Sequence, residues 1–297
     1  MRAMKKNIPC VGASQSRPRA LQLNLSAIPH FGYISPYVMV AALSALTSLK
    51  RLSLAFESPR FYPNPASRSP PPSTRSVLPV LTYFSFKGVS EYLDDLVACI
   101  DAPQLNHLFI TFFNDIVFDT SQLVRFISHT PMSKALRSAY ITLEDRVARV
   151  NFASQTSYSR ESAVEILCRG LDWQITSLEQ VCTCCLPPLS NLEDLYYEDW
   201  YSQSDRRSSV ENRQWLELFH PFTAVKNLYL SEELASHIVP ALQELVEGRT
   251  TGVLPALQNI FLKGLDSSGS VQESIGQLVA ARQAANHPIG ISPWTDS

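Results

Sequence analysis

The sequence contains little glycine and none of the short motifs that mark the common catalytic folds. Its 297 residues include only 10 glycines. The stretch 264–269 has the length of a phosphate-binding loop, but Ser270-Val271 stands where such a loop needs lysine followed by serine or threonine. Neither a Gly-x-Ser-x-Gly turn nor a His-Glu-x-x-His pair occurs. We therefore predict that the protein is not an enzyme and uses no cofactor.

Cysteine is also sparse, and its placement argues against a metal site. Of the 6 cysteines, only Cys182, Cys184 and Cys185 lie close together in sequence. A structural zinc site usually takes four ligands from two separated pairs, and no second pair accompanies this cluster. We predict no metal, and interpret Cys182 and Cys185 as small residues on the buried face of a helix. The alternative is a zinc site with a distant ligand pair.

Long hydrophobic runs and a basic excess are both missing. The longest apolar run, Tyr37 to Leu46, is too short to cross a bilayer. The net charge of -2 lacks the basic excess that is typical of nucleic-acid-binding proteins. Residues 1–20 form an irregular basic lead-in with no apolar run typical of a secretory signal, although a mitochondrial transit peptide would also lack acids. We expect an intracellular protein, cytoplasmic or nuclear, that binds neither membrane nor nucleic acid.

The chain does contain a repeated phrase. Val225-x-x-Leu228-x-Leu230 recurs as Leu257-x-x-Ile260-x-Leu262, and the segment between the two has apolar residues at helical spacing. A strand, a helix and a second strand of this kind are typical of a leucine-rich-repeat solenoid. The residue that opens the apolar-x-apolar pair recurs at Leu23, Leu52, Phe84, Leu108, Ala139, Ile166, Leu195, Leu228 and Ile260.

These steps predict an α/β fold in the form of a leucine-rich-repeat-like solenoid. It has irregular repeats of about 24–33 residues, a parallel β ribbon, and helices on the outer face. The solenoid is expected over residues 21–285, with a mobile proline- and serine-rich loop at 58–76 and a C-terminal tail at 286–297. The polar segment Arg146 to Arg160 either extends the sheet or leaves it as an excursion.

Strand geometry then selects candidate binding residues. In an apolar-x-apolar strand the flanking residues face the core, so the middle residue faces the opposite, concave surface. Exposed apolar surface and aromatic anchors mark protein-binding sites. Two structural alternatives remain, namely cross-strand packing of the aromatics and a C-terminal tail, with Trp294, folded back over the row. The predicted partner-binding row is Phe109, Tyr140, Leu167, Tyr196, Tyr229 and Phe261.

The order and spacing of several phrases resemble fungal F-box proteins of the leucine-rich-repeat-like type. The resemblance covers nearly all of the chain after about residue 21. The phrases are Tyr33-Ile34-Ser35-Pro36, Leu46 to Leu54, Ser58-Pro59-Arg60, Leu78 to Ser90, Ile110 to Asn114, Trp215 to Leu230 and Leu254 to Leu262.

In that family an N-terminal F-box grips the Skp-type adaptor of a cullin ubiquitin ligase, and the repeats choose the substrate. The resemblance therefore implies an interaction module, namely the substrate-recognition region of an F-box-like ubiquitin-ligase receptor. Because no F-box helices precede Leu21, adaptor and cullin are expected as partners only if a longer form carries an F-box. The alternative is a truncated or degenerate structural scaffold with no ligase role.

The proline-rich loop generates a first prediction. Ser58-Pro59 and Ser69-Pro70 match proline-directed phosphorylation sites, whereas an unmodified spacer is the plainer alternative. Mass spectrometry of protein isolated from its native cell distinguishes the two: phosphate at one or both serines is the result expected of a regulatory loop, and two unmodified serines are the result expected of a spacer. Finding both unmodified would count against regulation through this loop.

Overall fold

The computed structural model describes most of the chain after residue 20. The basic lead-in 1–20 and residues 58–73 of the proline-rich loop lie outside the described part, so the expectations for those segments are not addressed. The described residues are 21–29, 34–57, 74–113, 120–131, 136–153, 162–168, 170–186, 189–199, 210–244, 253–263, 269–284 and 286–294.

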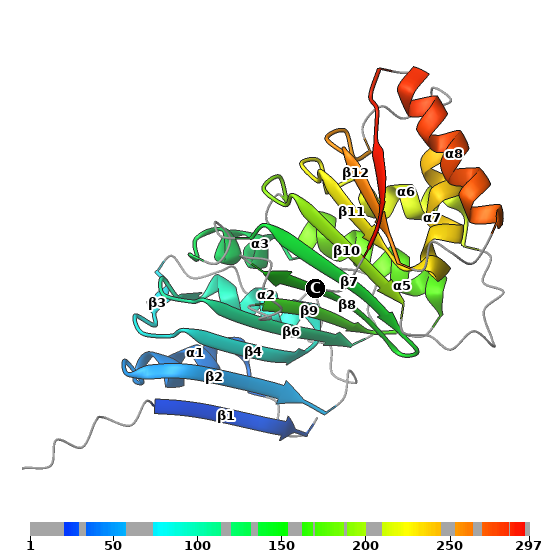
Figure 1. Cartoon of the computed structure of the whole chain (residues 1–297). Helices are drawn as coiled ribbons and strands as arrows, with labels where there is room; N and C mark the ends of the chain where they lie inside the picture. The colour runs from blue at the N-terminus through cyan, green and yellow to red at the C-terminus, as the bar shows by residue number, and fades with distance from the viewer. Residues whose placement is uncertain are drawn as a thin grey trace, which may run out of the picture.

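The fold is α/β, built around one large and mostly parallel sheet of 11 strands (Figure 1). The strand order is β1-β2-β4-β6-β9-β8-β7-β10-β11-β12-β13, and among the strands in the described residues only β8 runs antiparallel to its neighbours. The strands are β1 (Leu21–Ile28), β2 (Leu49–Phe56), β4 (Tyr83–Gly88), β6 (His107–Phe113), β7 (Ser138–Glu144), β8 (Val147–Ala153), β9 (Ser162–Leu167), β10 (Asp194–Asp199), β11 (Asn227–Leu230), β12 (Asn259–Leu262) and β13 (Gly290–Pro293).

The described helices lie along one face of this sheet, each against the next (Figure 1). A small second sheet pairs β3 (Ser76–Val77) with β5 (Ile100–Asp101). Helix α5 continues into a π-helical turn, η3 (Val181–Cys185). The helices are α1 (Pro36–Ser44), α2 (Ser90–Ala98), α3 (Ser121–Ser128), α5 (Leu171–Gln180), α6 (Asn212–Phe219), α7 (Glu232–Glu244) and α8 (Gly269–Ala284).

Successive side chains of each strand point alternately to the helix-covered face and to the open face of the sheet. Leu195, Leu228 and Ile260 pair in register on β10, β11 and β12, and none is more than 1% exposed. Tyr229 and Phe261, one position further along, are half-buried on the open face. The predicted division of these strands into core and open positions is therefore confirmed.

Helices present matching apolar stripes to the closed face of the sheet. Trp215, Leu218 and Phe219 of α6 are at most 1% exposed, and α6 begins with a capping box in which Glu211 and Gln214 satisfy each other's backbone N–H groups. Burial of such stripes supplies the main stabilising free energy, at about 25 cal/mol per Å² of apolar surface. Sheet and helices thus share one continuous core.

The sequential strand order implied by the repeat steps is wrong in the middle of the sheet. Strand β7 turns through Asp145-Arg146 into β8, forming a hairpin, and β9 then returns to lie beside β6. Residues Val147–Ala153 of the segment Arg146 to Arg160 therefore extend the sheet, because Ala148 and Val150 alternate with Arg149 and Asn151 as a strand with one covered face requires. The remainder of that segment, 154–160, lies outside the described residues. A short hairpin connection favours antiparallel pairing over the crossover expected from the repeats.

The C-terminal segment also differs from the expected tail. Residues 290–293 form strand β13, which adds in parallel to the edge strand β12 (Figure 1). Ile291 pairs with Ile260, and Ile289 is 7% exposed, so the segment continues the apolar pattern of the sheet. None of the described helices has the length and continuous apolar character that a membrane-spanning helix needs.

The core assignment can be tested at Leu228, which is fully buried between Leu195 and Ile260. We expect Leu228→Ala to lower the free energy of unfolding by about 2–5 kcal/mol through the cavity that it leaves. Denaturant unfolding followed by circular dichroism measures the change. Val38→Ala on α1, where the side chain is 60% exposed, is the control and should stay within about 0.5 kcal/mol of wild type. A loss near zero at Leu228 would show that the two faces are reversed.

Candidate functional site

The open face of the sheet is ordered by strand register. A row of residues, each paired with the next across neighbouring strands, crosses the middle of the sheet. Residues that pair in this way point to the same face, so the whole row lies on the open face. From β6 to β13 this row consists of Phe109, Ala163, Asn151, Tyr140, Tyr196, Tyr229, Phe261 and Ser292.

Four of these residues form a continuous aromatic stack: Tyr140, Tyr196, Tyr229 and Phe261. Successive ring centroids lie 4.3, 4.1 and 4.5 Å apart, and the successive interplanar angles are 9°, 12° and 10°. In-register parallel strands about 4.8 Å apart impose this spacing. All four side chains are half-buried, so the stack both braces the sheet and presents an aromatic edge outward.

The phenols of Tyr196 and Tyr229 stay neutral at physiological pH. Burial, and then the nearby Tyr229 and Tyr140, raise the pKa of Tyr196 well above that of a free phenol. Burial also raises the pKa of Tyr229. Neutral tyrosine can donate and accept a hydrogen bond while its ring makes apolar contact. The stack therefore suits recognition of another apolar or aromatic group with a polar edge.

Phe109 does not belong to this stack. Strands β9 and β8 stand between β6 and β7, and they place Ala163 and Asn151 between Phe109 and Tyr140. Phe109 instead lies 5.4 Å from Tyr83, measured between ring centroids. The sequence predicted an aromatic row across adjacent strands, and the hairpin breaks that row.

Leu167 was assigned to the wrong level of the sheet. It does face the open side, but it pairs with Phe113 and Val147, while Ala163 occupies the level of the aromatic stack. The four-residue offset places Leu167 roughly 13 Å along the strand from the predicted position. Shifting a strand by an even number of residues leaves each side chain on the same face but changes the residues with which it pairs. The apolar-x-apolar pattern reports only the face, so it could not reveal this shift.

The C-terminal segment covers part of the aromatic stack. The ring centroid of Trp294 lies 5.9 Å from Tyr196 and 5.7 Å from Tyr229, with interplanar angles of 56° and 67°. The Lys263 ammonium lies 5.2 Å from the Trp294 ring centroid. The alternative in which Trp294 folds back over the row is therefore confirmed for these two tyrosines.

A polar ladder that the sequence interpretation missed runs beside the aromatic stack. Asn259 Nδ2 donates to Asn227 Oδ1 at 2.9 Å, Asn227 Nδ2 donates to Asp194 Oδ1 at 2.8 Å, and Ser138 Oγ donates to Asp194 Oδ2 at 3.5 Å. The signal was present in the sequence, because an Asp or Asn directly precedes the apolar-x-apolar phrase on each of β10, β11 and β12. On β13 the position paired with Asn259 is Gly290. A Cβ at this position would lie only 3.0 Å from Asn259 Oδ1, so a larger residue would crowd the end of the ladder.

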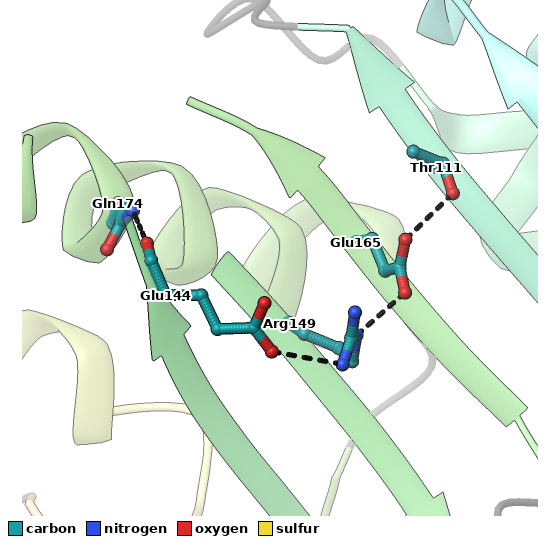
Figure 2. A network of polar contacts seen from close by, with 5 residues as sticks. All are labelled: Thr111, Glu144, Arg149, Glu165 and Gln174. Carbon is teal, nitrogen blue, oxygen red and sulfur yellow. Dashed lines mark hydrogen bonds and ion pairs between the residues drawn. The ribbon is translucent and has the colours of Figure 1, made fainter. Parts of the chain in front are cut away.

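An ionic network occupies the centre of the open face (Figure 2). Arg149 Nε donates to Glu165 Oε1 at 2.7 Å, and Arg149 Nη1 lies 3.4 Å from Glu144 Oε1. Thr111 Oγ1 donates to Glu165 Oε2 at 3.2 Å. On the helix side Gln174 Nε2 donates to the Glu144 carbonyl at 2.6 Å, which ties the end of β7 to α5. The network joins β6, β9, β8 and β7, the strands whose order the sequence did not predict.

A separate cavity of about 660 Å³ lies on the helix side. Its lining includes Glu179, Cys182, Thr183, Glu217 and His220. Burial, and to a lesser degree the charge of Glu217, raise the pKa of Glu179, although Thr183 Oγ1 donates to its Oε1 at 3.2 Å. The hydrogen bond from Thr183 therefore holds the Glu179 side chain at the wall of this cavity.

The clustered cysteines behave as buried structural residues. Cys182 and Cys185 are 3% and 1% exposed, as predicted, while Cys184 is exposed. Burial raises the pKa of Cys185 to about 12 and that of Cys182 further, so both remain thiols rather than reactive thiolates. Within the described part of the chain, no three His, Cys, Asp or Glu side chains are placed to hold a metal ion.

Comparison of the chain with protein-family models, with curated proteins and with solved structures gave no match. The geometry of the open face is therefore the basis for any assignment of function. Its main features are the aromatic stack, the polar ladder, the Arg149 network and the Trp294 contact.

The Arg149 network can be tested by a double-mutant cycle. We expect Arg149→Met and Glu165→Gln to show a coupling of about 0.5–3 kcal/mol in unfolding free energy, because the two side chains are only 17% and 29% exposed. Arg213 and Glu217 provide a matched control at the same 2.7 Å separation, with side chains 81% and 48% exposed. Solvent screening should make the coupling of the control pair clearly smaller. Equal coupling in both pairs would contradict a structural role for the network.

Proposed function

We propose that this protein is a non-enzymatic protein-interaction module that binds a partner through the open face of its sheet. The proposal treats the fold as a leucine-rich-repeat-like solenoid, in which the open face corresponds to the concave surface. By the family resemblance of its sequence phrases, the module would serve as the substrate-recognition region of an F-box-like ubiquitin-ligase receptor inside the cell.

The observation that supports this proposal most directly is the aromatic stack. Tyr140, Tyr196, Tyr229 and Phe261 are held on rigid, in-register strands and remain half-buried rather than enclosed. Tyrosine provides a large contact area at a small entropic cost and is enriched at binding hot spots. Because the strands fix the rings before binding, a partner loses little free energy in ordering this surface.

The surroundings of the stack suggest the partner's shape. The polar ladder of Ser138, Asp194, Asn227 and Asn259 lies along one side of the stack, and the register level of Thr142 and Glu198 lies along the other. An apolar strip between two polar borders suits an extended segment with apolar side chains on the rings and polar groups on the borders.

Contacts within the stack favour the second candidate, a structural scaffold without a partner. Ring centroids 4.1–4.5 Å apart show that the aromatics also stabilise the strand pairs themselves. The two candidates predict different results when the rings are removed. A scaffold would lose only stability, whereas a receptor would also lose binding of its partner.

Ligase membership depends on partners that bind outside the open face. A Skp-type adaptor and a cullin are proposed only for a longer form that carries an F-box. Affinity purification of the endogenous protein followed by mass spectrometry tests this point separately. Recovery of adaptor and cullin with the endogenous protein supports a ligase receptor, and their absence favours an interaction module outside the ligase.

The interaction proposal predicts that Tyr196→Ser and Tyr229→Ser together abolish partner capture while the fold persists. The measurement compares quantitative affinity purification from native cells with circular dichroism of the same variants. Tyr37→Ser is the control, since Tyr37 is 38% exposed on α1 and lies on the helix side. Capture that is unchanged in the double variant would refute the proposal, and loss in the Tyr37 control would show that the effect is not specific to the stack.

A further inference from the structure

The C-terminal segment shows what kind of side chain the aromatic stack can receive. Trp294 follows β13 directly, and its backbone N–H donates to the Leu262 carbonyl at 2.7 Å. From this position the indole meets Tyr196 and Tyr229 at an angle, in the edge-to-face manner that aromatic rings prefer over a face-to-face sandwich. Lys263 adds a cation–π contact on the indole.

This segment is a weakly built part of the sheet. Strand β13 has only four residues, lies at the edge, and includes Pro293, which has no backbone N–H to donate. Ile291 is half-buried and Pro293 is exposed. Edge elements with few hydrogen bonds and little buried surface open at a lower free-energy cost than core strands. The Trp294 contact therefore adds to the backbone pairing with β12 in holding this segment in place.

The aromatic stack does not require Trp294 for its own geometry. Its four rings already contact one another through consecutive strands, from Tyr140 to Phe261. Trp294 contributes a ring from outside that series and stays half-buried. It thus occupies the stack in the way that an incoming side chain would.

We infer that the aromatic stack is a receptor for an aromatic side chain on an extended segment, and that residues 291–294 occupy it as an internal competitor. The partner would supply a short strand-like segment with an aromatic residue, which contacts Tyr196 and Tyr229 after Trp294 leaves. The inference rests on the proposed function and specifies the partner's chemistry. Recognition of extended segments at sheet edges is an established binding mode.

An internal competitor of this kind has a measurable consequence. A tethered segment competes at an effective concentration that is commonly in the millimolar range. Only molecules whose segment has opened can bind an external ligand, so the apparent affinity is reduced by the open fraction. Releasing the segment should therefore strengthen external binding by at least about tenfold.

The test uses the full-length chain and a fluorescently labelled synthetic peptide that corresponds to residues 286–297. Fluorescence anisotropy measures peptide binding to wild type, to Trp294→Ala, and to Ile291→Ser/Trp294→Ala, in which the two apolar side chains of residues 291–294 that pack on the sheet are shortened. Trp173→Ala is the matched control, because this tryptophan is 50% exposed on α5, on the helix side. Circular dichroism confirms that each variant is folded.

The expected result is binding to the Ile291→Ser/Trp294→Ala chain at least about tenfold tighter than to wild type or to the Trp173→Ala control. Binding should be lost when the peptide itself carries Trp294→Ala, and when Tyr196→Ser and Tyr229→Ser are added to the released chain. A Trp294→Phe chain should block the peptide nearly as well as wild type, because the ring is retained.

Equal binding to all folded chains, or none to any of them, overturns the inference. If the peptide fails to bind while partner capture still requires Tyr196 and Tyr229, the inference fails and the proposed function stands. If the peptide binds as expected while capture does not depend on the tyrosines, the proposed function fails. In that outcome the stack still accepts an aromatic side chain in competition with residues 291–294, and the partner captured from cells binds elsewhere on the protein.

Discussion

In-register pairing of parallel strands is the constraint on which the rest of this structure depends. At a spacing of about 4.8 Å, equivalent residues on neighbouring strands must contact one another. On the closed face this constraint aligns Leu195, Leu228 and Ile260 in the core. On the open face it aligns Tyr196, Tyr229 and Phe261 into a stack. Stability and the candidate binding surface therefore arise from the same backbone hydrogen bonds.

The antiparallel hairpin of β7 and β8 divides the open face into chemically different regions. Strand β8 contributes Arg149 and Asn151 where a repeated strand would contribute an apolar or aromatic residue. Arg149 is compensated by Glu165 on β9 and by Glu144 on β7, so the charges are paired across three strands. The continuous aromatic stack is consequently confined to the strands from β7 onward, and Phe109 lies apart from it, beyond the polar centre and against Tyr83.

The same aromatic chemistry serves support and recognition, and the position of Trp294 makes the two roles compatible. Rings that stack across neighbouring strands hold one another by face contact, while their outer edges remain able to accept a further ring at an angle. A short edge strand that carries this further ring is attached to the sheet at one side only. The stack can therefore keep its geometry whether or not the C-terminal segment is in place.

The sequence by itself determined which side chains are buried, because alternation and helical spacing are local patterns that hydrophobic burial enforces. It predicted the faces of Leu228, Tyr229, Ile260 and Phe261, and the burial of Cys182, without any coordinates. Only the tertiary structure decided which strands are neighbours and at what level they pair. Pairing across distant residues depends on backbone hydrogen bonds and turn geometry that no local pattern encodes, and a shift by two or four residues leaves every face unchanged. For this reason the fold decided the register position of Leu167, joined the Asp and Asn side chains into a ladder, and selected the arrangement in which Trp294 lies on the aromatic stack.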